Sequence, residues 1–135
     1  MTKSSWFPAA AIALVWLVLV WMALSYRPLM PIDETRYVGV AWDMWLRGDW
    51  LVPQLNGRPY PDKPPLLFWL IKLGWGVFGV GDVWPRMVAP LFGLGSLAAA
   101  WGLARRLWPE DRTLALMVPW VLLGSLLWTV FATVT

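Results

Sequence analysis

The sequence of 135 residues contains no cysteine and no histidine. Without cysteine, the protein has no disulfide bond, no thiolate nucleophile and no cysteine-ligated metal. Without histidine, it lacks the side chain that proteins use most often as a general base and as a metal ligand. Any proton transfer must therefore depend on Asp, Glu, Lys or Tyr.

Charged residues are also scarce. They make up 14% of the chain, whereas hydrophobic residues make up 59%, and tryptophan alone occurs 13 times. An average soluble domain carries about 25% charged residues, and a domain of this size leaves about a third of its unfolded surface exposed to water. The composition therefore excludes a soluble globular domain and a disordered chain, and it indicates an integral membrane protein.

The net charge of +3 is modest. Most Lys and Arg residues stand at the edges of apolar runs or in one polar stretch, and they form no continuous basic block. This distribution is typical of a membrane protein, and it gives no sign of a nucleic-acid partner.

Three apolar runs are long enough to cross a bilayer, because a transmembrane helix needs about 20 apolar residues. They extend over residues 8–26, 87–104 and 113–135, and none contains a Lys, Arg, Asp or Glu. This absence argues against a proton-coupled carrier, which needs an ionisable residue in mid-membrane. Ala23-Leu24-Ser25 fits a signal-peptide cleavage site, but the first run is long and bulky, and we expect an uncleaved anchor with a cytoplasmic N-terminus.

A fourth apolar run, residues 66–80, is short and has Lys72 at its middle, where we expect this side chain to face a cavity, a partner or lipid headgroups. If the run only dips into the membrane, the arginine-rich loop 105–112 lies in the cytoplasm, as the positive-inside rule requires. We therefore predict an all-α polytopic membrane protein with three transmembrane helices and a periplasmic loop at 27–86. Backbone that dips into a membrane needs protein or water around it, so we expect neighbouring helices outside this chain.

Two helices are predicted in the periplasmic loop, at residues 33–47 and 66–80. The first is amphipathic, and Gly48 ends it. Its apolar stripe contains Tyr37, Val38, Ala41, Trp42, Trp45 and Leu46. Such a helix is expected to lie in the membrane interface. Residues 51–60 are predicted to form a loop with a turn at Asn56-Gly57.

The same loop contains the residues that can perform chemistry. Asp33 and Glu34 follow the first span, Asp62 and Lys63 precede the dipping helix, and Arg86 starts the second span. Cations bind a lipid phosphate, and a carboxylate takes a proton from a hydroxyl. Each residue also has a structural interpretation. Asp33 would cap the helix and Glu34 would suit its first turn, whereas Lys63 and Arg86 would be interfacial anchors.

Taken together, the motifs of this loop resemble a known family. They are Pro31-Ile32-Asp33-Glu34-Thr35-Arg36-Tyr37, Gly48-Asp49-Trp50-Leu51-Val52-Pro53, Asn56-Gly57, Tyr60 and Lys63-Pro64-Pro65. Nearly the whole chain resembles the start of the bacterial aminoarabinose transferases that modify lipid A. It also resembles, more distantly, the protein O-mannosyltransferases. Both are polytopic glycosyltransferases with the GT-C fold, and the motifs indicate this superfamily without selecting one member.

The resemblance implies a membrane enzyme that takes a sugar from a polyprenyl-phosphate carrier. The sugar passes to a lipid or protein acceptor at the periplasmic face of the bacterial inner membrane. In the family, the residue matching Asp33 is the catalytic carboxylate, and those matching Arg36 and Lys63 lie by the carrier phosphate. We expect Arg86 to join these cations. The supporting residues are expected to be Glu34, Tyr37, Tyr60 and Asp62.

The resemblance also bears on a metal. In aminoarabinose transferases the residue before the motif lysine is Glu and can take part in a metal site with His, but this chain has Asp62 there and no His. The sequence therefore assigns no cofactor, and a divalent metal would lack that histidine ligand. The implied partners are the polyprenyl-phosphate sugar donor, the acceptor, membrane lipids and the remaining transmembrane helices of a longer chain.

The sequence stops inside its last apolar run, whereas family members have many more spans and a second acidic residue just beyond the matching span. We therefore expect the chain to be the N-terminal part of a larger protein and to be inactive by itself. The alternative is a non-enzymatic membrane protein, such as a small transporter subunit or an assembly factor. Continuation of the reading frame past Thr135 would favour the enzyme.

Overall fold

The computed structural model describes residues 6–29 and 33–133, which divide into two compact units. One unit contains the described residues up to Tyr26 and those from Ala89 onward, and the other contains those between Arg27 and Val88. The sequence motifs lie in the second unit, apart from the part of the first motif that falls on residues 31–32, outside the described residues.

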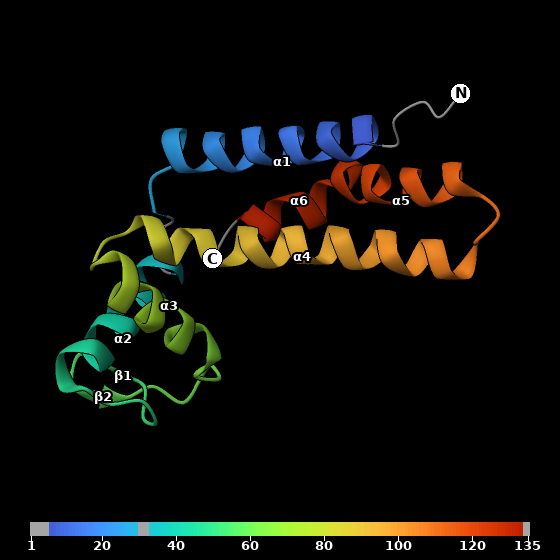
Figure 1. Ribbon diagram of the computed structural model, residues 1–135. Helices are drawn as coiled ribbons and strands as arrows, with labels where there is room; N and C mark the ends of the chain where they lie inside the picture. Colours follow the sequence, from blue (N-terminus) through green and yellow to red (C-terminus); the bar gives the residue numbers. More distant parts are fainter. Residues whose placement is uncertain (1–5, 30–32, 134–135) are drawn as a thin grey trace. The chain divides into compact units, whose positions relative to one another are not determined.

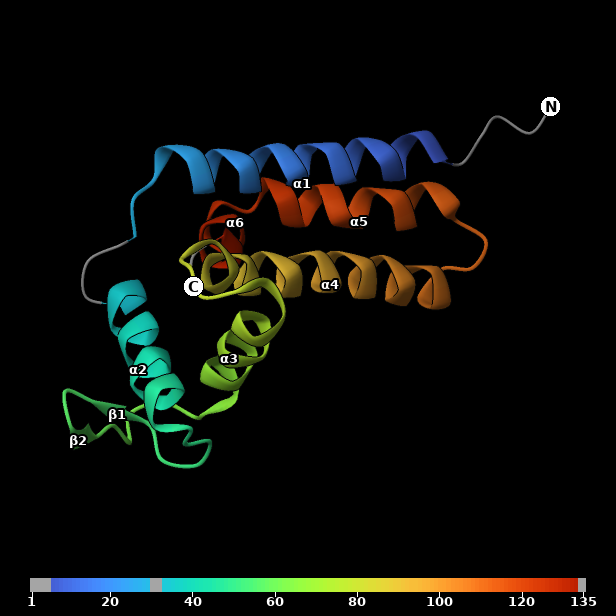
Figure 2. The same cartoon turned by 60° about the vertical axis from the view of Figure 1, so that its left-hand side comes forward.

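The first unit is a bundle of apolar helices. It contains α1 (Trp6–Tyr26), most of α4 (Val83–Leu107), α5 (Arg112–Gly124) and α6 (Leu126–Thr133). Both views show α1, α4 and α5 side by side (Figures 1 and 2). Residues four apart on α1, namely Ile12, Trp16 and Val20, are buried and form its packing face. Many other apolar side chains of these helices are exposed, as expected for helices that face lipid.

A close approach between α1 and α4 depends on a glycine. A Cβ atom at Gly93 would lie 2.6 Å from the ring of Trp16, which is too close for any side chain. The same tryptophan ring lies 5.4 Å from the ring of Trp128 on α6. Gly93 therefore provides the space for the indole that joins three helices of this unit.

The third predicted span differs from the structure. Residues 113–135 were expected to form one continuous helix, but α5 ends at Gly124 and α6 starts at Leu126, with a bend of 72° between them. Ser125 is extended at the break, with φ −75° and ψ 106°. The Thr129 hydroxyl donates to the Leu123 carbonyl at 2.9 Å and satisfies a group that the break exposes. Residues 134–135 lie outside the described residues.

Judged by length and composition alone, the described residues contain fewer candidate spans than the three that the sequence predicted. Among the described residues, only α4 is by itself long and apolar enough to cross a membrane, and α5 with α6 reaches that length as a bent pair. The apolar part of α1, Ala10–Tyr26, is shorter. The structure therefore contains at least one candidate span, and the count of three stays a prediction.

The second unit contains α2 (Asp33–Arg47), α3 (Leu66–Phe78) and a hairpin of β1 (Gln54–Leu55) and β2 (Arg58–Pro59). The bounds of α2 are those predicted, and Gly48 follows it with φ +67°. The predicted loop is a short antiparallel hairpin with its turn at Asn56-Gly57, where φ is +54° and +75°. Two successive positive φ values are typical of the tight type I′ turn.

The core of this unit lies between α2 and α3. Its fully buried side chains include Val40 and Met44 from α2 and Phe68 and Ile71 from α3. The predicted apolar stripe of α2 was therefore partly wrong, because its members Trp42 and Leu46 are 40% and 63% exposed. The side of α2 that packs against α3 and β1 carries Val40 and Met44, and the core cluster does not include Trp42 or Leu46.

Candidate functional site

The candidate site begins at the first turn of α2. The helix starts at Asp33, so Asp33 lies inside the first turn and does not precede it as the cap that the sequence suggested. The side chain of Asp33 is exposed, whereas that of Glu34 is 1% exposed. Neighbouring residues on a helix point about 100° apart, which places one carboxylate in the open and the other in the interior. Asp33 is thus the accessible carboxylate of the pair.

Arg36 connects the first turn of α2 to the hairpin. Its guanidinium interacts with the side chain of Tyr60, and this interaction is the main reason why the pKa of Arg36 is raised above its ordinary value. Burial acts against the rise, and electrostatic interactions with Tyr60, Asp33 and Tyr37 add to it. The structure therefore brings four of the residues predicted from the sequence close together, from two segments.

The position of Tyr60 follows from the hairpin and from α3. Its amide donates to the Pro53 carbonyl at 2.8 Å, which continues the pairing of β1 and β2 by one residue. Its ring centroid lies 6.4 Å from that of Phe68 on α3, and the ring of Tyr37 lies at the same distance from Phe68. The buried Phe68 thus holds both tyrosines.

Asp62 and Lys63 follow the hairpin and are exposed. Lys63 comes three residues after Tyr60, so its α-carbon lies within about 11 Å of that of Tyr60. Pro64 restricts Lys63 to extended backbone, and Pro65 stands at the start of α3. The lysine therefore follows Tyr60 on a short connection, and its side chain is exposed.

Arg86 and Glu34 have a different environment. Both contact Arg27, a residue that the sequence analysis did not assign to the site. Arg27 Nη2 lies 2.8 Å from Glu34 Oε1, and Arg86 Nη2 donates to the Arg27 carbonyl at 2.6 Å. Arg86 is 8% exposed. These contacts connect the segment after α1, the first turn of α2 and the first turn of α4. Arg86 is therefore buried among structural contacts, whereas Lys63 is exposed.

Lys72 makes contacts inside this unit, and the expectation that it faces a cavity, a partner or headgroups was wrong. Its side chain is 2% exposed. Nζ donates to the carbonyls of Met44, at 3.0 Å, and Asp49, and it lies 4.1 Å from the ring centroid of Trp50. The last carbonyls of a helix lack partners within the helix, and a cation there interacts well with the helix dipole. Lys72 therefore caps the C-terminal end of α2.

The Gly48-Asp49-Trp50 motif folds the chain between α2 and the hairpin. Asp49 Oδ1 accepts from the amides of Leu51 and Val52, at 2.9 Å and 3.4 Å. These bonds lower the pKa of the Asp49 carboxyl below its ordinary value. The Trp69 indole of α3 donates to the Trp50 carbonyl at 2.5 Å. The motif thus has a structural role in this unit.

The described residues do not form the metal site that the resemblance raised. Within residues 6–29 and 33–133, no three side chains of His, Cys, Asp or Glu come together as metal ligands. Asp62 is exposed on its loop.

The chain is similar in sequence to known transferases, although no protein-family model matches it. It is 40% identical over 90 residues to the undecaprenyl phosphate-alpha-4-amino-4-deoxy-L-arabinose arabinosyl transferase of Pseudomonas paraeruginosa. It is 35% identical over 104 residues to the transferase of the same name from Edwardsiella ictaluri. These matches cover 67% and 77% of this chain but 16% and 18% of the two relatives.

Two solved structures have the same fold over almost the whole chain. ArnT from Cupriavidus metallidurans bound to undecaprenyl phosphate matches 97% of this chain with a TM-score of 0.83 and 29% identity. The same protein in the apo state matches 93% with a TM-score of 0.81 and 30% identity. This chain covers 24% and 23% of those chains. The resemblance to aminoarabinose transferases is confirmed, and the mostly helical fold agrees with the N-terminal portion of a GT-C fold.

Proposed function

We propose that this chain forms part of the active site of a membrane glycosyltransferase. The enzyme would move a sugar from a polyprenyl-phosphate carrier to a lipid A-like lipid or to a protein. Two findings support this proposal: the names of the curated relatives describe undecaprenyl phosphate-aminoarabinose transferases, and one solved relative is bound to undecaprenyl phosphate. The chain spans 16% of the first relative, so we assign to it only a share of the site.

The observation that carries the proposal is the packing of Tyr37 and Tyr60 against the same buried ring of Phe68, with 6.4 Å between the ring centroids in each pair. It joins the segment with the exposed carboxylate of Asp33 to the segment with the exposed ammonium of Lys63. A glycosyl transfer from a phosphate needs both charges. The cations bind the phosphate that leaves, and the carboxylate activates the hydroxyl that attacks.

The proposed reaction is a displacement at the anomeric carbon of the sugar. The acceptor hydroxyl oxygen forms a bond to this carbon while Asp33 accepts the hydroxyl proton. The bond between the anomeric carbon and the phosphate oxygen breaks, and the polyprenyl phosphate leaves with the electron pair. Lys63 and Arg36 stabilise the negative charge of the departing phosphate.

We propose that three residues position Asp33 for this reaction, namely Glu34, Arg27 and Arg86. Their contacts hold the first turn of α2, where Asp33 stands. The sequence suggested that Arg86 binds the phosphate directly. Its low exposure and its bond to the Arg27 carbonyl favour a role in fixing the backbone before α2.

The proposed location is the bacterial inner membrane, with a cytoplasmic N-terminus and the loop 27–86 in the periplasm. Arg105 and Arg106 lie in the last turn of α4, and Arg112 starts α5. The positive-inside rule assigns such a basic connection to the cytoplasm. With α1, α4 and the α5–α6 pair as spans, the polar loop and the arginine-rich loop lie on opposite sides.

The direct test uses the purified full-length protein with undecaprenyl-phosphate aminoarabinose and lipid A in mixed micelles. We expect one molecule of free undecaprenyl phosphate for each modified lipid A. If the sugar moves to a peptide acceptor and not to lipid A, the acceptor class changes while the reaction stands. If neither acceptor is modified and the donor stays intact, the non-enzymatic alternative replaces the proposal.

A further inference from the structure

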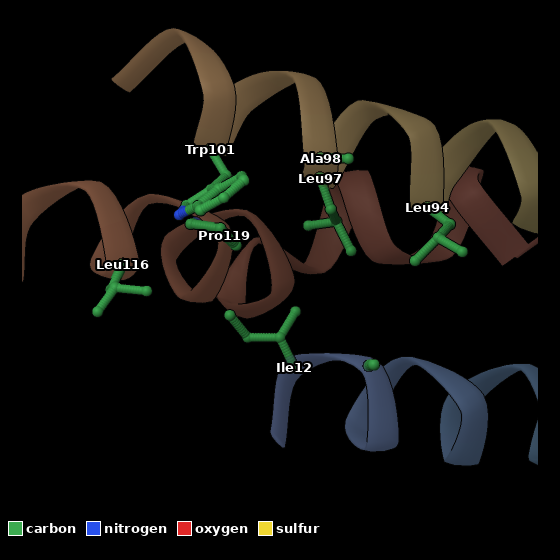
Figure 3. Close-up of a pocket in the computed structure, with 8 residues that line it drawn as sticks. Ile12, Leu94, Leu97, Ala98, Trp101, Leu116 and Pro119 are labelled. Carbon is green, nitrogen blue, oxygen red and sulfur yellow. The ribbon is translucent and has the colours of Figure 1, made fainter. Parts of the chain in front are cut away.

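An apolar pocket of about 190 Å³ lies in the unit formed by α1, α4 and α5. Ile12 of α1, Leu97, Ala98 and Trp101 of α4, and Leu116 and Pro119 of α5 line it. Figure 3 shows these side chains around one space between the three helices. Ala98 contributes only a methyl group to the wall, so a larger side chain at this position would reduce the space.

A cation stands at the edge of this pocket. Arg105 follows Trp101 by one helical turn on α4, and its guanidinium carbon lies 5.1 Å from the centroid of the Trp101 ring. The Arg105 side chain is exposed. A guanidinium over an indole face is held there by the ring quadrupole. Arg105 is therefore oriented by a residue that lines the pocket.

The charged residues around Arg105 are mostly cationic, which favours the binding of an anion. The turn between α4 and α5 contains Glu110 and Asp111 as its two carboxylates. The Asp111 carboxylate already accepts from the Leu114 amide at 2.9 Å and caps α5. Arg106 and Arg112 add positive charge to the same turn, so the arginines outnumber the carboxylates.

An apolar helix is a poor occupant for this pocket. Its side chains would approach Arg105 and remove water from a guanidinium, and an unpaired charge in an apolar environment is costly. A phospholipid with a negative headgroup fits both parts. One acyl chain fills the apolar space, and the phosphate pairs with the guanidinium by charge-assisted hydrogen bonds.

We propose that this pocket is a binding site for one anionic phospholipid of the membrane, with its phosphate at Arg105. Lipid tails are as apolar as the side chains around them, so a bilayer supplies no hydrophobic force that favours one lipid over another. Selection therefore depends on the headgroup, where a basic residue near a membrane surface contributes about 1 kcal/mol. The site is separate from the proposed transfer reaction, because none of its residues belongs to the unit with Asp33 and Lys63.

The test is native mass spectrometry of the full-length protein in detergent, titrated with phosphatidylglycerol or with phosphatidylcholine. We expect one phosphatidylglycerol per chain to bind more tightly than phosphatidylcholine. Arg105→Gln should weaken phosphatidylglycerol binding about fivefold, the factor that 1 kcal/mol represents. Arg105→Lys should keep most of the wild-type affinity, because a cation remains. Ala98→Leu should reduce binding of both lipids because it fills the pocket.

Two variants on the same helix are matched controls. Arg106 points about 100° away from Arg105, so Arg106→Gln should leave the affinity unchanged. Ala99→Leu adds the same volume as Ala98→Leu at a position that does not line this pocket. Equal affinity of the wild-type protein for the two lipids would overturn the proposal. An equal loss from Arg105→Gln and Arg106→Gln would also overturn it, since the effect would then be a general surface charge.

Discussion

Arg27 and Glu34 form an ion pair with 2.8 Å between Nη2 and Oε1, although Glu34 comes seven positions after Arg27 in the sequence. The Glu34 side chain is 1% exposed and that of Arg27 is 26% exposed. The pair ties the first turn of α2 to the segment that follows α1. Since Asp33 directly precedes Glu34, the pair also fixes where the accessible carboxylate stands.

Glu34→Gln should destabilise the protein without unfolding it. The variant removes the charge and keeps an oxygen that accepts a hydrogen bond, so we expect a loss of about 1–3 kcal/mol, below the cost of removing a fully buried partner. A thermal melt of the full-length protein measures this loss. The same change at the exposed Glu110 is the control, and equal melting temperatures for both variants would show that the pair is not stabilising.

Lys72→Met should also lower stability. It leaves the carbonyls of Met44 and Asp49 without their buried donor, which costs about 1–3 kcal/mol. Lys63→Met is the matched control, because Lys63 is exposed. It should leave the melting temperature unchanged while reducing sugar transfer about tenfold to a hundredfold, the effect of one lost charge-assisted contact. A reversed pattern would exchange the roles assigned to the two lysines.

Asp49 should make stability depend on pH in the acid range. Its pKa in the folded protein is lowered by the bonds from the Leu51 and Val52 amides. The stabilising contribution is therefore fully present above the unfolded pKa of about 3.9, and it is lost as the pH falls through the folded pKa. Asp49→Asn keeps an oxygen for the turn but does not titrate, so its melting temperature should fall less between about pH 4 and pH 2. The exposed Asp82→Asn variant should keep the wild-type slope.

The membrane topology can be tested with single cysteines, since the protein has none of its own. Arg58 lies in the hairpin and Arg106 at the end of α4. We expect a membrane-impermeant maleimide to label Arg58→Cys from the periplasm in intact cells, and to label Arg106→Cys only after the membrane is permeabilised. Labelling of both from one side would mean that Leu66–Phe78 crosses the membrane.

Local sequence signals predicted much of the second unit. The bounds of α2 follow from its periodicity and from Gly48, whose positive φ stops a helix. Asn56-Gly57 likewise marked the hairpin turn, because both residues tolerate positive φ. The strands themselves were not predicted, since each contains only two residues.

Contacts between residues far apart in the chain could not be predicted from the sequence. One of the two carbonyls that accept from Lys72 belongs to Met44, 28 residues earlier, and no local pattern indicates this pairing. The partly wrong stripe of α2 has the same origin, because the position of α3 decides which side of an amphipathic helix is covered. The break at Ser125 stands in a run without charge, and its composition does not distinguish a bent helix from a straight one. The placement of Arg27 had a weak signal, an opposite charge seven residues before Glu34.

The most direct test of the account is sugar transfer by Asp33→Asn in the full-length protein, measured from an undecaprenyl-phosphate sugar donor to lipid A together with a thermal melt. Asp33 is exposed in the first turn of α2, so the loss of its interaction with the helix dipole costs only about 0.3–1 kcal/mol. Asn cannot accept the proton of the acceptor hydroxyl, and general-base catalysis typically contributes 10²–10⁴-fold. We therefore predict a folded protein that has lost transfer by about that factor. A folded Asp33→Asn protein that transfers sugar at nearly the wild-type rate would contradict the catalytic assignment.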